Sequence, residues 1–191
     1  MTLQHVNVKL LLENPARVDL EPLIPIFHEW IQKQVFEELL LDVADYRHVP
    51  GGPGVIVIGH QADYSVDNTN HRLGVRYNRK AALDGSNLDR LEQAARAALT
   101  ACAKLEQDAR LGGTLRFNGQ EVEFFVNDRL LAPNGEASRA AADSDVQAFA
   151  KKLFQGGEFA LAYQQDPRRL FGAKMKAARK FSAAELLKNL A

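Results

Sequence analysis

The chain has 191 residues, of which 46% are hydrophobic and 25% are charged. This composition supplies enough apolar side chains for one globular domain over residues 1–191 and excludes disorder of the whole chain. The 24 basic and 24 acidic side chains give a formal charge of zero, so no overall field draws the protein to nucleic acid or to an anionic membrane. The single cysteine, Cys102, excludes an intrachain disulfide.

The first residues lack the pattern of a signal peptide, because Met1–Asn7 has no basic segment and Lys9 interrupts the apolar run that follows. The apolar runs, Val55–Gly59 among them, are far shorter than the roughly 20 residues that span a bilayer. We therefore expect a cytoplasmic protein with no membrane partner.

The first predicted strand, residues 6–13, is a β-compatible run that ends at Asn14-Pro15. Apolar residues at spacings of three and four then predict a helix over 20–37, whose regular part starts near Pro25 because proline disrupts a helix interior. Segments 39–49 and 55–62 flank the sequence Pro-Gly-Gly-Pro-Gly, which predicts a turn between two paired strands.

After a polar loop at 66–71, residues 72–79 alternate well enough for a fourth strand. A long amphipathic helix is expected over 87–108 with Ser86 as its N-cap. Asn118-Gly119 is a strong turn signal and predicts a hairpin of two short strands. These strands are 114–117 and 121–126, and the last expected elements are a helix at 143–154, strands at 159–163 and 171–176, and a helix at 182–190 capped by Ser182.

Together these elements predict an α+β fold with a mixed or mainly antiparallel sheet of about seven to eight strands and three to four helices. The order β-α-β-β occurs twice over residues 6–126. We therefore expect a structural repeat, although the two blocks share no convincing sequence similarity.

The densest polar cluster surrounds the Pro-Gly-rich turn. If that turn centres on Gly52, Tyr46 pairs with Ile58 and His48 with Ile56, which puts the phenol and the imidazoles of His48 and His60 on one face. Imidazole exchanges protons near neutral pH and so serves general acid–base chemistry. The candidate catalytic residues are His48 and His60, and the candidate binding residues are Asp45, Tyr46, Arg47, Asp63, Tyr64 and Arg76.

On the opposite face of this hairpin we expect Asp45 and Arg47 to pair with each other. The competing interpretation is a sheet face whose polar groups bond loops and one another, because no activity-specific spacing accompanies the cluster. A metal held by His48, His60 and Asp63 is disfavoured, since the two imidazoles would lie about 13 Å apart at about 3.3 Å per residue. We expect neither a metal nor a cofactor.

Six basic residues and no acidic one lie between Pro167 and Ala184: Arg168, Arg169, Lys174, Lys176, Arg179 and Lys180. Such a stretch could contact nucleic acid, with Phe171 and Phe181 stacking on bases. Lysines at alternate positions also describe an edge strand protected against aggregation. Because the rest of the chain is net acidic, the second interpretation is favoured over nucleic-acid binding.

The stretch Leu40–Tyr64, LLDVADYRHVPGGPGVIVIGHQADY, resembles a family of uncharacterised bacterial cytosolic proteins. The segment ENPARVDLEPLIPIFHEWIQ before it and FVNDRLLAPN at Phe125–Asn134 extend the resemblance over most of the chain. It implies a stand-alone bacterial domain. That family carries no assigned activity, so the resemblance assigns no role to any residue.

The first functional hypothesis is a non-catalytic binding or assembly protein that forms a homodimer, because Val55–Ile58 is apolar on both faces and needs cover. The alternative is an enzyme for a small polar or anionic substrate, with Arg47 and Arg76 holding the anion and His48 or His60 carrying the proton. A second alternative is nucleic-acid contact through residues 168–180. A pocket in which these groups converge would favour the enzyme.

Overall fold

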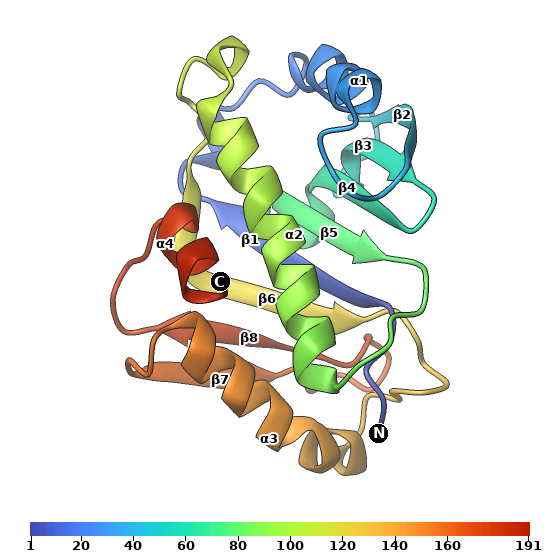
Figure 1. The fold of residues 1–191 in the computed structure, drawn as a ribbon, viewed down its shortest axis with the longest axis vertical. Helices are drawn as coiled ribbons and strands as arrows, with labels where there is room; N and C mark the ends of the chain where they lie inside the picture. Colours follow the sequence, from blue (N-terminus) through green and yellow to red (C-terminus); the bar gives the residue numbers. More distant parts are fainter.

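All four helices lie on one face of a single sheet, and the other face carries no helix (Figure 1). The computed structural model describes residues 1–191, apart from the side chain of Arg17. The sheet has eight strands in the order β2-β3-β4-β5-β1-β6-β8-β7, and every neighbouring pair is antiparallel. The predicted α+β class is therefore confirmed.

The strands are β1 (Val6–Leu12), β2 (Leu40–Tyr46), β3 (Gly54–Gly59), β4 (Ala62–Asp67), β5 (Gly74–Arg79), β6 (Phe117–Val126), β7 (Phe159–Tyr163) and β8 (Gly172–Ala177). The helices are α1 (Leu23–Lys33), α2 (Asn87–Gln107), α3 (Glu136–Leu153) and α4 (Ala183–Asn189). Three short 3₁₀ turns complete the chain: η1 (Pro15–Arg17), η2 (Thr69–His71) and η3 (Ala109–Leu111).

The predicted N-caps of α2 and α4 are confirmed. Ser86 accepts a hydrogen bond from the backbone of Asp89, whose carboxylate accepts one from Ser86 in return. Ser182 and Glu185 form the same reciprocal capping box at α4. Two other helices differ from expectation, since α1 already begins at Leu23 and α3 begins at Glu136, well before the predicted start at residue 143.

Two strand predictions were wrong. Residues 62–67 form a full strand, β4, because the β3–β4 turn is confined to His60 and Gln61. Residues 117–126 form one continuous strand rather than a hairpin around Asn118-Gly119. Gly119 is required there by packing, since a Cβ at this position would collide with the backbone carbonyl of Phe181.

The predicted β-α-β-β repeat is not present with its predicted boundaries, because its second block depended on a hairpin inside β6. The order does recur as β1-α1-β2-β3 and β6-α3-β7-β8. These two blocks are not equivalent in the sheet. In the second block the first strand pairs with the last, β6 with β8, whereas in the first block β1 pairs with β5 and β6 and not with β3. Residues 171–176 were predicted as an edge strand, but β8 lies between β6 and β7.

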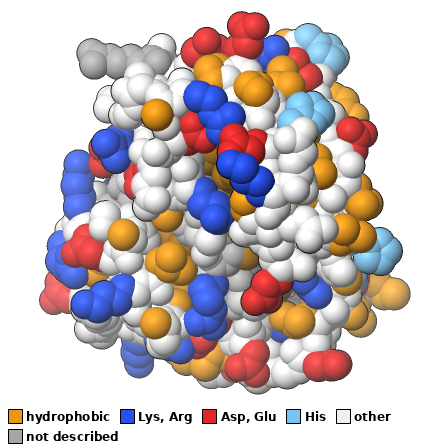
Figure 2. Space-filling view, turned by 45° about the horizontal axis from the view of Figure 1, so that its top comes forward, with side chains coloured by type: hydrophobic (Ala, Val, Ile, Leu, Met, Phe, Trp, Pro, Cys, Tyr) orange, Lys and Arg blue, Asp and Glu red, His pale blue; other side chains and the backbone are white. Residues whose placement is uncertain are grey.

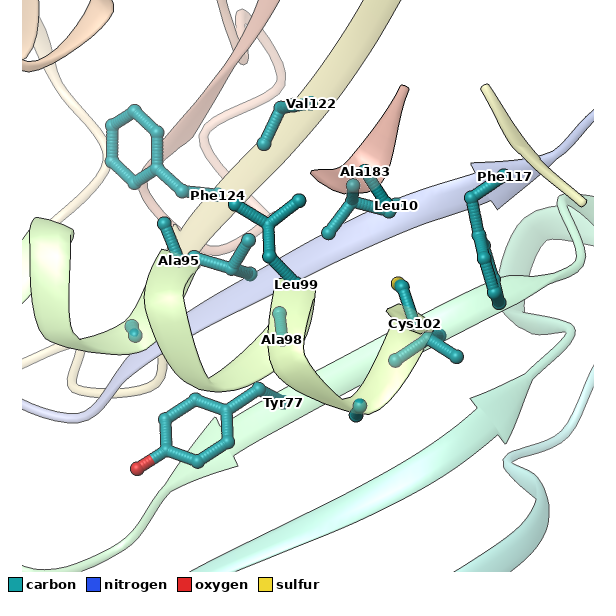
Figure 3. Packing of buried hydrophobic residues seen from close by; sticks show 14 of the residues in the cluster. Leu10, Tyr77, Ala95, Ala98, Leu99, Cys102, Phe117, Val122, Phe124 and Ala183 are labelled. Atoms are coloured by element: carbon teal, nitrogen blue, oxygen red, sulfur yellow. The ribbon is translucent and has the colours of Figure 1, made fainter. Parts of the chain in front are cut away.

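One hydrophobic core fills the space between the sheet and the helices. Figure 3 shows Leu99 of α2 pointing toward the strand residues Val122 and Phe124, with Cys102 on the same helix among the apolar side chains. Burial raises the pKa of the Cys102 thiol well above its usual range, so this cysteine is a packing residue.

Two cross-strand rows, displaced from each other by one residue, describe the two faces of the sheet. The row under the helices is almost wholly apolar and aromatic: Val43, Val57, Tyr64, Tyr77, Val8, Phe124, Ala173 and Tyr163. The helix-free row is polar in its centre: Ala44, Ile56, Ser65, Arg76, Lys9, Glu123, Lys174 and Ala162. Side chains alternate between faces along each strand, which explains the contrast.

The outer surface at the α1 end of the molecule carries basic and acidic side chains next to one another (Figure 2). One such pair joins Arg110 to Glu29 of α1 at 2.7 Å. None of the described helices has both the length and the apolar character needed to cross a membrane.

Candidate functional site

The register of the β2–β3 hairpin differs from the predicted one. Tyr46 pairs with Gly54 rather than with Ile58, because the turn centres on Pro50 rather than on Gly52. His48 therefore lies beyond the paired strands in the turn, whereas His60 follows Gly59 at the other end of the hairpin. The six residues of β3 between them correspond to about 20 Å at about 3.3 Å per residue. The two candidate catalytic histidines do not converge.

Two local predictions for this hairpin are confirmed. Arg47 donates from Nε and Nη2 to the carboxylate of Asp45 at 2.9 and 2.8 Å, and this interaction lowers the Asp45 pKa to about 2. The rings of Tyr46 and His48 lie on the same side, with centroids 6.3 Å apart. All four residues are exposed, so this end of the hairpin forms an open surface.

Asp63 and Tyr64 sit on opposite faces of β4, so they do not form one site. Asp63 pairs with Lys80 at 2.6 Å and accepts a hydrogen bond from Asn78 at 3.1 Å on the helix-free face. Tyr64 is buried under the helices and donates its hydroxyl to Glu38 at 2.9 Å. Both residues therefore have structural partners that account for their polar groups.

A second buried tyrosine completes this interior network. The Tyr77 hydroxyl donates to the other oxygen of Glu38 at 2.9 Å and accepts a hydrogen bond from Gln93 at 2.9 Å. Burial, followed by the charge of Glu38, raises the pKa of Tyr77 to about 12 and moves the Tyr64 pKa upward for the same reasons. The two phenols act here as hydrogen-bond donors that hold one carboxylate.

Arg76, the remaining candidate binding residue, lies in an ionic cluster at the centre of the helix-free face. Its Nε donates to Asn7 at 3.0 Å, its Nη1 lies 3.6 Å from Asp67, and its guanidinium lies over the ring of Phe125 at 4.7 Å. The Lys9 ammonium donates to the other carboxylate oxygen of Asp67. Lys9 is only 4% exposed and Asp67 is fully buried.

Burial lowers the pKa of both Lys9 and Arg76, and the nearby Asp67 carboxylate opposes this shift. The next positions along the same face continue the alternation of charge. Arg72 donates to Glu121 at 2.5 Å and to Glu123, and Lys174 lies 3.3 Å from Glu123. The sheet centre is therefore polar but largely withdrawn from solvent.

A cleft of about 840 Å³ opens over this cluster. Its walls come from four separate parts of the chain: β1, the segment from Asp67 to Arg76, the end of β6 with Arg129, and the segment from Ala162 to Lys174. Its volume falls within the usual range for a small-molecule site. The seven basic lining residues are Lys9, Arg72, Arg76, Arg129, Arg168, Arg169 and Lys174, against three acidic ones, Asp67, Glu123 and Asp166.

Two of the basic residues lie where two loops meet. Arg129 donates to the backbone carbonyl of Arg168 at 2.8 Å, which ties the β6–α3 loop to the β7–β8 loop. Among the described residues, Arg129 and Arg169 have no carboxylate within ion-pair distance, whereas Arg168 pairs with Asp166 at 3.0 Å. These two guanidinium groups are therefore the cations of the cleft that have no carboxylate partner among the described residues.

The cleft wall at η2 contains two adjacent residues with left-handed backbone conformations, Asn70 (φ 61°) and His71 (φ 56°). Asp67 holds this segment by accepting hydrogen bonds from the Thr69 backbone at 3.1 Å and the Thr69 hydroxyl at 2.8 Å. Strained backbone of this kind is concentrated at binding and catalytic sites.

The Pro-Gly-rich turn contacts this wall of the cleft. The carbonyl of Gly52 accepts a hydrogen bond from the Asn68 backbone at 3.0 Å. At Gly51 (φ 62°), an added Cβ would lie 3.6 Å from the His71 ring. The β2–β3 hairpin, which the sequence predicted as the site, therefore contacts the η2 wall of the cleft and lies beside the cleft.

The basic stretch 168–180 is divided between two places. Arg168, Arg169 and Lys174 line the cleft, whereas Arg179 lies over the ring of Phe181 at 3.5 Å and pairs with Glu185 at 3.5 Å. The stretch does not form one continuous basic surface. Of the residues that the sequence singled out for binding, Arg76 and the first half of the basic stretch, Arg168 to Lys174, therefore lie at the cleft.

No protein-family model matches the chain. No curated protein matches it either.

Proposed function

We propose that this protein binds an anionic small molecule in the cleft on the helix-free face. The observation that carries the proposal is the excess of four positive charges around a cleft of about 840 Å³, with Arg129 and Arg169 free of carboxylate partners. Guanidinium groups present several donors in a plane and suit carboxylate and phosphate ligands.

Binding without chemistry is favoured over catalysis, because the two proposed proton carriers lie outside this cleft and at opposite ends of the β2–β3 hairpin. His48 and His60 are not among the residues that line it. Arg76, which the sequence nominated as an anion holder, does line it. The anionic ligand that the enzyme hypothesis expected is therefore retained, but as the ligand of a binding protein.

The test is a calorimetric titration with inorganic phosphate, pyrophosphate and citrate, carried out on the wild type and on the double variant Arg129→Gln/Arg169→Gln. Loss of charge-assisted hydrogen bonds costs about 1.5–3 kcal/mol each, so binding should weaken at least about tenfold. It should also weaken as salt is raised. The matched control is Lys151→Gln/Lys188→Gln, which removes the same charge from exposed positions on α3 and α4.

Equal binding by the wild type and the Arg129→Gln/Arg169→Gln variant would contradict the proposal. So would equal weakening by the control variant, because that result would show a response to net charge alone. Absence of binding for all three anions at low salt would also count against an anion site.

A further inference from the structure

Both edges of the sheet lack the usual protection against pairing with another strand. β7 forms one edge and contains neither lysine nor proline, and its exposed side chains are the small ones of Ala160 and Ala162. β2 forms the other edge and contains neither lysine nor proline. Edge strands without such protection pair readily with another chain.

Large apolar side chains are exposed along the β2 edge. Leu39 is 48% exposed and Leu41 is 54% exposed, and Tyr46 and Val49 are also exposed. These four are more than half of the exposed large hydrophobic residues of the described chain, the others being Met1, Leu130 and Leu131. Leu41 and Tyr46 lie in β2, Leu39 directly precedes it, and Val49 lies in the turn that follows. A concentration of this kind at one edge of the sheet indicates an interaction surface.

The free backbone groups of β2 can be assigned from its partners. Gly59 donates to Asp63 on the β4 side, and His60 donates to the Leu39 carbonyl on the β2 side at 2.8 Å. By alternation, the even-numbered residues of β2 bond to β3, and Val43 and Asp45 direct their backbone groups outward. Consistently, the Val43 N–H donates to the carboxylate of Asp42 at 2.8 Å.

These assignments leave a small choice of registers for a second, antiparallel β2. One register puts Asp45 opposite its own copy, which brings like charges together. A register centred on Ala44 instead puts Asp42 of one copy opposite Tyr46 of the other. This register offers the Asp42 carboxylate a hydroxyl donor and brings the exposed apolar side chains near both ends of β2 to the interface.

We propose that two copies of this chain associate through their β2 strands, antiparallel and around a twofold axis at Ala44, so that their sheets become continuous. The self-complementary pattern of β2 supports a second copy as the partner, since the Asp42 carboxylate near its start has no cationic partner among the described residues and lies opposite the Tyr46 hydroxyl at its end. The anion cleft does not include β2, so the two proposals can fail independently.

The register is tested by oxidative cross-linking. In the proposed dimer, residue 44 faces its own copy across a non-hydrogen-bonded pair, where Cα atoms lie about 4.5 Å apart and a disulfide can form. Ala44→Cys should give a covalent dimer of twice the 21.2 kDa chain mass under oxidising, non-reducing conditions. The native thiol, Cys102, is buried and does not compete.

Asp42→Cys is the control for this register, because residue 42 would lie about 13 Å from its own copy at about 3.3 Å per residue and should not cross-link. Absence of a covalent dimer for Ala44→Cys would overturn the proposed register. Equal cross-linking of Asp42→Cys would overturn it as well.

The interface is tested by sedimentation at micromolar concentration. Wild type and Leu130→Lys should sediment at twice 21.2 kDa, whereas Leu39→Lys/Leu41→Lys should sediment at 21.2 kDa with an unchanged circular dichroism spectrum. A wild type that sediments only as the single chain, or a Leu39→Lys/Leu41→Lys variant that remains dimeric, would refute association through β2.

Discussion

The two faces of the sheet are made by the same eight strands, yet different interactions hold them. Under the helices, the central residues are Tyr77, Val8 and Phe124, and the polar atoms of the two buried tyrosines converge on one carboxylate. One residue further along the same strands, the central residues are Arg76, Lys9 and Glu123.

A sheet face without helices is therefore not necessarily a solvated face. Lys9 and Asp67 are as buried as many core residues, because the surrounding arginine side chains and the cleft walls cover them. Burying a charge is costly unless it is paired and hydrogen-bonded. The helix-free face is therefore stabilised by ionic pairs and hydrogen bonds, and the helix-covered face by apolar packing.

The largest loss of folding stability is expected when the buried carboxylate of Asp67 is removed. We expect Asp67→Ala to lower the free energy of unfolding by about 3–5 kcal/mol, because it leaves the buried Lys9 ammonium without its counterion. Urea denaturation followed by circular dichroism measures this loss. Lys9→Met/Asp67→Ala should recover much of it.

The matched control for this prediction is Asp63→Ala on the same face. The Asp63–Lys80 pair is more exposed, and we expect a loss of about 1 kcal/mol or less. If Asp63→Ala and Asp67→Ala were equally destabilising, burial of the Lys9–Asp67 pair would not be the reason.

The buried tyrosines of the helix-covered face should make the folding stability depend on pH. The pKa of Tyr77 is raised to about 12, and those of Tyr64 and Tyr163 are raised in the same direction. Since the folded chain then binds more protons than the unfolded chain above about pH 10, stability is complete below that pH and declines as the pH rises toward 12. The decline should be about 1 kcal/mol per pH unit for each such tyrosine.

Unfolding midpoints in urea between pH 8 and pH 11 measure this effect. Tyr77→Phe should be less stable at pH 8 but should show a flatter decline, because it has no phenol to ionise. Tyr46→Phe, which removes an exposed hydroxyl, should follow the wild-type curve. A Tyr77→Phe profile as steep as that of the wild type would show that this phenol is not responsible.

The architecture was largely predictable because its signals are local. The Ser86 and Ser182 caps and the amphipathic stripe of α2 each depend on residues within a few turns of one another. The failures at β4 and Gly119 had a different origin. Gly119 is a glycine because the backbone of Phe181 approaches it closely, and a contact between positions so far apart in sequence leaves no local signal.

The candidate site was predictable only in part for the same reason. The sequence predicted the Asp45–Arg47 pair, which is local, and it singled out Arg76 and the stretch from Arg168. It could not place them together, because Arg76 and Arg129 reach the cleft through strands whose order is set by non-local pairing. The hairpin register was missed because residues 47–49 belong to the turn, where Val49 donates to the Tyr46 carbonyl.

The smallest effects are expected at the histidines of the hairpin. His48→Ala and His60→Ala should each change the free energy of unfolding by about 0.5 kcal/mol or less, because both side chains are exposed. Neither should alter anion binding in the titration described above. A loss of binding comparable to that of Arg129→Gln/Arg169→Gln would move the site back to the hairpin.

The position of β1 also has a consequence for how the chain folds. This strand lies in the middle of the sheet, but its partners are distant in sequence: Asn7 pairs with Asn78, and Val6 pairs with Val126. Such non-local pairing slows folding, so the apolar segment Val6–Leu12 must wait unpaired during synthesis. Lys9 interrupts that segment with a charge and so protects it from aggregation in the meantime.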